Sequence, residues 1–159
     1  MSNTIKAIFC LCLFVVCSVF IVYQENENDE VASVAASGSS MSYNEKVTLL
    51  ARAIHAEAEA EPYIGKVAVG AVLLNRVNNS QFPNTLSGVI YQGSALESVS
   101  NGRMDSSAGQ ESRKAATAAL NGWDPTYGSL FFWNPYKKVN KWVWTRQIVV
   151  QYGKHVFAR

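Results

Sequence analysis

Two glutamates near the end of the segment LLARAIHAEAEAEP are the residues best placed to do acid–base chemistry. Read as a helix, the segment has apolar residues at the i, i+3, i+4 and i+7 spacing of a buried stripe, and Glu57 lies on or beside that stripe. Glu61 follows one turn later on the same side, whereas Glu59 points to solvent. A carboxyl group on an apolar face is costly to ionise and tends to keep its proton. Glu57 is therefore a candidate general acid of the kind that cleaves glycosidic bonds, the alternative being a structural carboxylate at the core edge or paired with an arginine.

Other chemistries lack the residues that they need. His55-Ala56-Glu57 has the H-x-E form of zinc nucleoside deaminases, which also require a downstream P-C-x-x-C. All three cysteines lie at or before Cys17, and His155 is the only other histidine, so that zinc site cannot be completed. No G-x-S-x-G nucleophile motif and no phosphate-binding glycine loop occurs. We expect neither a metal nor another cofactor.

Two long helices are expected to position Glu57. Ser42-x-x-Glu45 has the form of a capping box, which predicts a helix from there to about Glu61, ended by Pro62. A second helix is predicted after Gly65, with a buried face whose small residues permit close approach to a neighbour: Val67, Gly70, Ala71, Leu74 and Val77. Near its end, Arg76 is expected either to snorkel or to hold a carboxylate in place.

Two further helices and a loop are predicted next. Thr85–Tyr91 has the character of a short helix, and Gln92–Asp105 that of a loop or short strand at the edge of a cleft. Ser107-x-x-Gln110 repeats the capping-box form before an Ala-rich helix, and Asn121-Gly122 is a plausible left-handed cap at its end.

The C-terminal region is rich in aromatic and basic residues. Leu130–Trp133 and Trp142–Val150 are predicted strands, with a turn at Asn134-Pro135. All four tryptophans lie in this part of the chain: Trp123, Trp133, Trp142 and Trp144. Flat aromatic faces stack on sugar rings and cations suit the carboxylates of a cell wall. Alternatively the rings are the core of a small β lobe, and we expect about half of them to be core.

The first 40 residues differ in composition from the rest. Lys6 precedes the apolar run Ala7–Val22, whose length lies between a signal-peptide core and a membrane span, and the best cleavage sites, around Val34–Ala36, are too far downstream. We therefore interpret residues 1–24 as an uncleaved membrane anchor in preference to a cleaved signal, with export in either case. Residues 25–40, acidic and rich in Ser and Ala, have the composition of a flexible tether.

Charge divides unevenly at the same boundary. Residues 1–40 have a net charge of −3 and residues 41–159 a net charge of +5. A basic domain suits an anionic polymer such as wall glycan, an anionic membrane surface or nucleic acid, although ordinary solubility accounts for a charge of this size almost as well. Export argues against nucleic acid as the partner.

Several separated motifs in residues 41–159 carry a resemblance to a known family. They are EAEAEPYIGKVAVGAVLLNRV, FPNTLSGVIYQ, ALNGWDPT, FFWNPYKKVNKWVWTR and KHVF. In this order they resemble the catalytic domain of the spore cortex-lytic cell wall hydrolases (the SleB/CwlJ family), from about Leu49 to the C-terminus. The resemblance implies a lysozyme-like α+β fold, with a mainly helical lobe and a small aromatic-rich β region. It also implies peptidoglycan glycan strands as the substrate, cleaved between N-acetylmuramic acid and N-acetylglucosamine.

The family pattern E-A-x-G-E-P places the catalytic glutamate on Glu57 and a supporting glutamate on Glu61. The chain departs from that pattern at Glu59, an extra acid, at Ala60, which replaces a glycine, and at His55, where asparagine is common. We expect the following residues at the substrate: Glu61, Tyr91, Trp133, Asn134, Tyr136, Lys137, Trp142 and Trp144.

We expect cleavage by a lytic transglycosylase with one catalytic glutamate, and a muramidase is the alternative. A lytic transglycosylase needs one carboxyl group, because the nucleophile is the C6 hydroxyl of the substrate itself. A muramidase needs a second carboxylate to activate water, for which Glu61, Glu97 and Asp105 are candidates. A non-catalytic, membrane-anchored wall-binding module and a metal-dependent hydrolase are the rival interpretations, and spore, vegetative-wall and phage-lysis roles are equally open.

Overall fold

The structure, a computed structural model, describes residues 41–92, 104 and 107–159. Residues 42–159 form one compact unit. The predicted anchor (1–24), the predicted tether (25–40) and the candidate carboxylates Glu97 and Asp105 lie outside the described residues. No helix of the described part has both the length and the apolar character that a membrane span requires.

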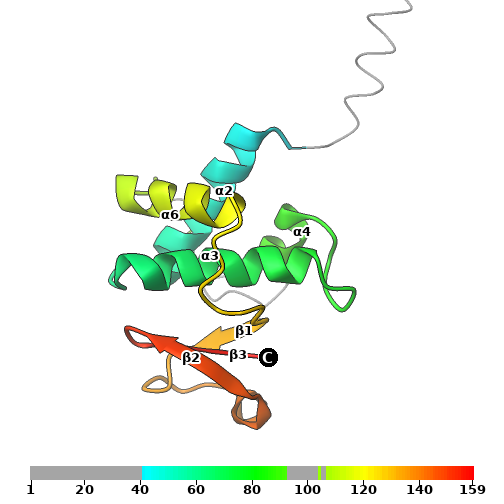
Figure 1. The fold of residues 1–159 in the computed structure, drawn as a ribbon, viewed down its shortest axis with the longest axis vertical. Helices are drawn as coiled ribbons and strands as arrows, with labels where there is room; N and C mark the ends of the chain where they lie inside the picture. The colour runs from blue at the N-terminus through cyan, green and yellow to red at the C-terminus, as the bar shows by residue number, and fades with distance from the viewer. Residues whose placement is uncertain (1–40, 93–103, 105–106) are drawn as a thin grey trace, which may run out of the picture. The chain divides into compact units, whose positions relative to one another are not determined.

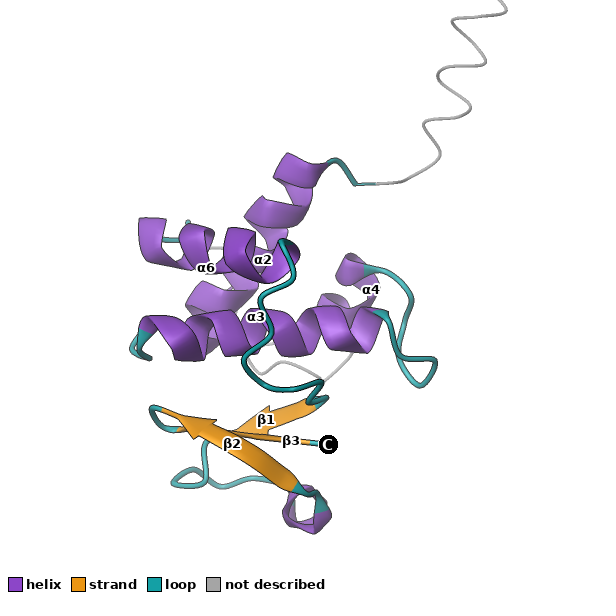
Figure 2. Ribbon diagram, viewed as in Figure 1, coloured by secondary structure: helices purple, strands orange, loops and turns teal. Residues whose placement is uncertain are grey.

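Helices and strands are segregated into a helical region and a small sheet (Figure 2). The described elements are α2 (Tyr43–Ala58), α3 (Tyr63–Val77), α4 (Leu86–Tyr91), α6 (Gln110–Leu120), β1 (Phe131–Trp133), η2 (Lys141–Thr145), β2 (Ile148–Tyr152) and β3 (His155–Ala158). The three strands are antiparallel in the order β1-β3-β2. Helix α3 lies between the sheet and the other long helices, and it contacts both β1 and β2 (Figure 1). The expected α+β fold is confirmed.

The core of the helical region forms where α2, α3 and α6 pack on one another. Leu50 and Ile54 of the predicted stripe are fully buried. A Cβ atom added at Gly70 would lie 2.9 Å from Ile54 Cδ1 and 3.2 Å from Ala119 Cβ, so a larger residue would push the three helices apart. The close approach predicted for α3 is therefore present, and it seats α2 firmly against its neighbours.

The predicted start of α2 is correct, but its predicted end is wrong. Ser42 and Glu45 form the capping box, with the Glu45 carboxylate accepting from Ser42 N at 2.8 Å. The helix stops at Ala58, and Glu61 N donates to Ala58 O at 3.0 Å in the turn that follows. Because Pro62 disfavours helical geometry in the residue before it, the chain must leave the helix earlier. Glu61 is consequently not one helical turn beyond Glu57.

Two helix starts also differ from the sequence prediction. Helix α3 begins at Tyr63, before Gly65, since Pro62 already has the extended backbone of an N-cap. Helix α6 begins after Gly109, which makes no side-chain cap, so the second predicted capping box is wrong. The predicted end of α6 is confirmed, with Gly122 in the left-handed region at φ +96°.

The β lobe contains one strand that the sequence analysis missed. The predicted strand Trp142–Val150 is in fact the 3₁₀ helix η2 followed by β2, and the Asn140 side chain caps η2 by accepting from Trp142 N at 3.3 Å. The missed strand is β3, the central one, whose four residues are all buried. The short apolar run of β3 lacks the alternation of apolar and polar residues by which a half-buried strand is recognised. Pairing with β1 and β2 on its two edges stabilises the strand.

Candidate active site

Glu57 lies in the last turn of α2, half-buried and close to two buried basic side chains. Burial lowers the pKa of the Arg76 guanidinium to about 10, and the Glu57 carboxylate opposes that shift. Burial also lowers the pKa of His155, against the charges of Glu61 and then Glu57, which raise it. Glu57 therefore acts electrostatically on groups from α3 and β3.

Arg76 ties the end of α3 to the chain that enters β1. The residue is 7% exposed, and its Nε donates to Leu130 O at 2.7 Å. Its guanidinium carbon lies 5.3 Å from the ring centroid of Phe82 and 5.9 Å from that of Phe132. The expectation that Arg76 snorkels is wrong, because its charged group is packed between the helices and the sheet.

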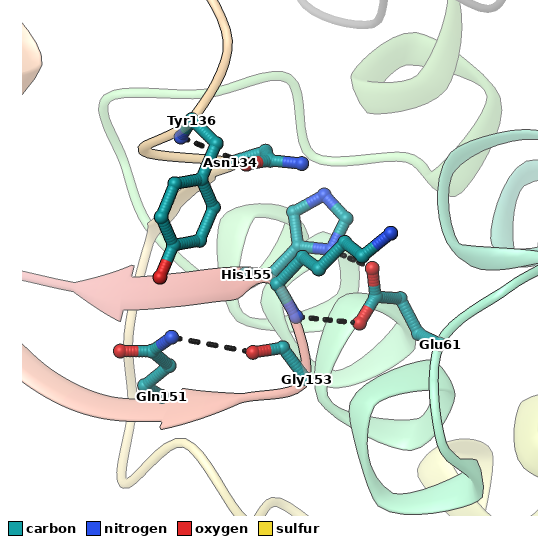
Figure 3. Close-up of polar contacts among 7 residues, drawn as sticks. Glu61, Asn134, Tyr136, Gln151, Gly153 and His155 are labelled. Carbon is teal, nitrogen blue, oxygen red and sulfur yellow. Dashed lines mark hydrogen bonds and ion pairs between the residues drawn. The ribbon is translucent and has the colours of Figure 1, made fainter.

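Glu61 is a buried carboxylate turned toward the β2–β3 hairpin (Figure 3). Its Oε2 accepts from Lys154 N at 2.8 Å, and its Oε1 lies 3.3 Å from His155 Nδ1. This last approach is close but is not aligned as a hydrogen bond.

The hairpin turn fits closely around Glu61. Gly153 has φ +55°, and a Cβ atom added there would lie 1.9 Å from Glu61 Oε2 and 2.7 Å from Pro62 Cδ. Gly153 O also accepts from Gln151 Nε2 at 3.2 Å, as Figure 3 shows. Only glycine satisfies both the backbone conformation and the space. Glu61 thus joins the start of α3 to the sheet.

The predicted tryptophans divide between buried and exposed positions. Trp133 is 5% exposed, and its ring packs edge-on to that of Trp144 with the centroids 5.6 Å apart. Trp142 packs edge-on to Phe131 at 5.3 Å, and the Arg146 guanidinium lies 5.0 Å from the Trp142 centroid. Both Trp142 and Trp144 keep a large exposed surface, 41% and 52%. Of these three rings, that of Trp133 is in the core, and those of Trp142 and Trp144 keep solvent-exposed surface.

The loop after β1 carries three more of the predicted residues. Asn134 is half-buried and accepts at Oδ1 from Tyr136 N at 2.9 Å, whereas the Tyr136 side chain is 81% exposed. Exposed Lys137 lowers the pKa of His155 through its charge, which places this loop near His155. Tyr91, by contrast, ends α4 with half of its surface exposed, on a helix that packs on α2 and α3.

Asp124 organises the loop that leads into β1. Burial alone would raise its pKa, but hydrogen bonds from the Thr126 side chain and backbone, Asn75 Nδ2 and Gly128 N outweigh burial and lower it. Asn75 Nδ2 donates to Asp124 Oδ2 at 3.0 Å and to Ser129 O at 3.2 Å, which fastens the loop to α3. The sequence analysis missed this role and that of His155, although both residues lie in motifs of the resemblance.

The chain belongs to the Cell Wall Hydrolase family, whose model matches residues 60–158. It is similar to the spore cortex-lytic enzyme of Bacillus cereus (43% identity over 113 residues, 71% of this chain and 44% of the relative). It is also similar to the cell wall hydrolase CwlJ of Bacillus subtilis (33% over 118 residues, 70% of this chain and 82% of the relative).

Solved structures agree with the sequence relatives. The crystal structure of the catalytic domain of the Bacillus cereus SleB protein has a TM-score of 0.70 and 42% identity, covering 76% of this chain and 94% of that one. The catalytic domain of the germination-specific lytic transglycosylase SleB from Bacillus anthracis has a TM-score of 0.70 and 41% identity, covering 76% and 98%. The resemblance inferred from the motifs is confirmed. The chain spans less than half the length of the spore cortex-lytic enzyme of Bacillus cereus, 44%.

Proposed function

We propose that this chain cleaves peptidoglycan glycan strands between N-acetylmuramic acid and N-acetylglucosamine as a lytic transglycosylase, with Glu57 as its one catalytic carboxyl group. Family membership and the likeness to a lytic transglycosylase domain support the substrate and the reaction. The observation that carries the assignment is the position of Glu57, half-buried at the end of α2 and coupled in charge to buried Arg76 and His155. Such clusters of perturbed ionisable groups are typical of catalytic sites.

In the proposed reaction, Glu57 gives one proton and takes one back. Protonated Glu57 donates to the glycosidic oxygen, and the bond from the muramic acid C1 to that oxygen breaks. The carboxylate that results is favoured by the nearby positive charge of Arg76. It then accepts the proton of the C6 hydroxyl as that oxygen bonds to C1 and closes a 1,6-anhydro ring. No water is consumed, and Glu57 ends protonated.

Glu61 is one of three candidates for the second carboxylate of a muramidase, the other two, Glu97 and Asp105, lying outside the described residues. A muramidase would use a second carboxylate as base or nucleophile. Both oxygens of Glu61 are already directed at the hairpin, one to Lys154 N and one to His155. We assign Glu61 a positioning role for this reason.

The exposed aromatic and basic residues of the β lobe are the proposed contacts to the glycan. Tyr136, Trp142 and Trp144 present ring faces for sugar stacking, and Lys137 offers a cation to the wall carboxylates. Trp133 supports the Trp144 ring from below the surface. We retain Tyr91 and Asn134 as candidate contacts at the margins of this surface.

Action on the wall requires delivery to it. We propose that the apolar segment of residues 1–24 anchors or exports the chain and that residues 25–40 tether the domain of residues 41–159, so that it reaches the peptidoglycan from the membrane.

The test is Glu57→Gln, which keeps the shape of the side chain but removes its proton chemistry. Turbidity loss of purified peptidoglycan should fall at least about a hundredfold, since general acid–base catalysis contributes about 10²–10⁴. Glu59→Gln is the matched control, because the Glu59 side chain is 63% exposed and lies two residues away. Near-normal activity of Glu57→Gln would remove the assignment.

Mass spectrometry of the products chooses between the two reactions. Anhydro-muropeptides support the transglycosylase, and reducing-end muramic acid would replace it with a muramidase. Binding of peptidoglycan by the unmodified chain without any product would instead identify a wall-binding module.

A further inference from the structure

A second surface of the domain combines cations, polar groups and aromatic rings. The outward face of α6 and the start of α3 line an open groove of about 470 Å³. Its lining includes Tyr63, Gln110, Arg113, Lys114, Thr117 and Asn121, and no lining residue is acidic. This groove lies on elements other than those of the β lobe, where the proposed glycan contacts are found.

Aromatic rings stand at one end of the groove. The half-buried ring of Tyr63 and the ring of Trp123 have centroids 6.0 Å apart at an interplanar angle of 50°. Trp123 N donates to the carbonyl of Ala118, a lining residue, at 3.1 Å, so the Trp123 backbone is held next to the groove. With Trp123 45% exposed, an aromatic face is available to a ligand.

The cations of the groove are not neutralised by the described part of the protein. Arg113 and Lys114 are exposed, and neither forms an ion pair with any described residue. The neighbouring acid on α6, Glu111, is bound to Lys66 instead. Asn121, also in the lining, accepts at Oδ1 from the Tyr43 hydroxyl at 3.1 Å.

We propose that this groove is a second binding site for a carboxylate-bearing sugar polymer, and that it holds one stretch of peptidoglycan while Glu57 acts on another. The proposal rests on the proposed function for the identity of the polymer. The carboxylates of the polymer would bind Arg113 and Lys114 by charge complementarity, and the exposed Trp123 ring is suited to contact a sugar ring. Thr117, Gln110 and Asn121 add hydroxyl and amide groups that can bond sugar hydroxyls.

The test compares binding and turnover in the full chain. The Glu57→Gln background prevents digestion. In this background Arg113→Gln/Lys114→Gln should bind purified sacculi about fivefold more weakly, because it removes two exposed charge contacts to the polymer. Trp123→Ala should act in the same direction. Lys46→Gln and Tyr127→Ala are the controls, because they remove a cation and an exposed ring outside both surfaces.

Turnover separates the groove from the Glu57 site. With Glu57 intact, Arg113→Gln/Lys114→Gln should lower the ratio of activity on sacculi to activity on short soluble glycan fragments by about fivefold. A thermal melt followed by circular dichroism checks that each variant is folded.

Three results would overturn the inference. The first is equal sacculus binding by the groove variant and Lys46→Gln. The second is an equal loss on sacculi and on short fragments, which would mean that the groove acts through the Glu57 site. The third is that the groove variant loses binding to anionic phospholipid vesicles but still binds sacculi normally, which would identify the groove as a lipid-binding surface. If the unmodified chain digests neither substrate, the proposed function fails, while the binding comparison still decides the groove.

Discussion

Gly153→Ala is the substitution whose effect follows most directly from the geometry of the site. The new methyl carbon would lie 1.9 Å from Glu61 Oε2, so the carboxylate must leave its position and give up the hydrogen bond from Lys154 N. A non-glycine residue in the left-handed region costs about 1–2 kcal/mol. Loss of a hydrogen bond to a charged group costs about 1.5–3 kcal/mol. The free energy of unfolding should therefore fall by about 2.5–5 kcal/mol.

The assay is urea unfolding followed by tryptophan fluorescence, in which a loss of this size shifts the midpoint by about 1–2.5 M for a slope near 2 kcal/mol/M. Gly122→Ala is the matched control, because Gly122 also has positive φ (+96°) but a Cβ atom there meets nothing within 4 Å. It should show the backbone cost alone, about 1–2 kcal/mol. In a Glu61→Ala background, Gly153→Ala should lose much of its effect, since the two residues are coupled.

Equal destabilisation by Gly153→Ala and Gly122→Ala would refute the reasoning, because it would mean that the hairpin turn is not fitted around Glu61. Full additivity of Gly153→Ala and Glu61→Ala would refute it as well.

Two further predictions concern pH and the loop before β1. Burial lowers the pKa of His155 below its ordinary 6.5, so at this residue the unfolded chain binds a proton more readily than the folded chain does. The contribution of His155 to stability should be full above pH 6.5 and should fall as the pH drops below 6.5. In a pH series of urea midpoints, His155→Gln should flatten this decrease. Asp124 has a pKa lowered below its ordinary 3.8, so its contribution to stability is present above that value and is lost as the pH falls through the lowered pKa. Asp124→Ala should cost about 1–3 kcal/mol at pH 7 and progressively less in a series of urea midpoints at acid pH, and a cost that does not depend on pH would contradict the role given to its charge.

Local signals in the sequence were sufficient for the helices. The apolar stripe through Leu50 and Ile54 predicted the buried face of α2, and the Ser42 capping box predicted its start, because both depend on residues within a few positions of one another. The small residue Gly70 predicted close packing for the same reason. The position of Glu57 beside the core followed from this periodicity alone.

The contacts around Glu57 could not be predicted in this way, because they join segments far apart in the chain. Glu61 is 93 positions from Lys154, whose backbone nitrogen it accepts from, and Arg76 is 54 positions from Leu130. Helical periodicity assigned Glu61 to the face of Glu57, although Pro62 ends the helix earlier and turns the carboxylate toward the sheet. The sequence analysis considered His155 only as a metal ligand, since its burial depends on the missed strand β3.

These long-range contacts explain how a helical region and a small sheet can hold one acid in place. Arg76 fastens the end of α3 to the entry of β1, and Glu61 fastens the start of α3 to the β2–β3 turn, so the sheet is tied to both ends of the same helix. A sheet tied at one end could pivot about that link, whereas two links fix its orientation. Glu57 interacts electrostatically with Arg76 at the first link and His155 at the second, so the geometry that fixes the sheet also fixes the charges around the proposed acid. The exposed rings of Tyr136, Trp142 and Trp144 lie in the connection between β1 and β2, so the two links that orient the sheet also orient the segment that carries these rings.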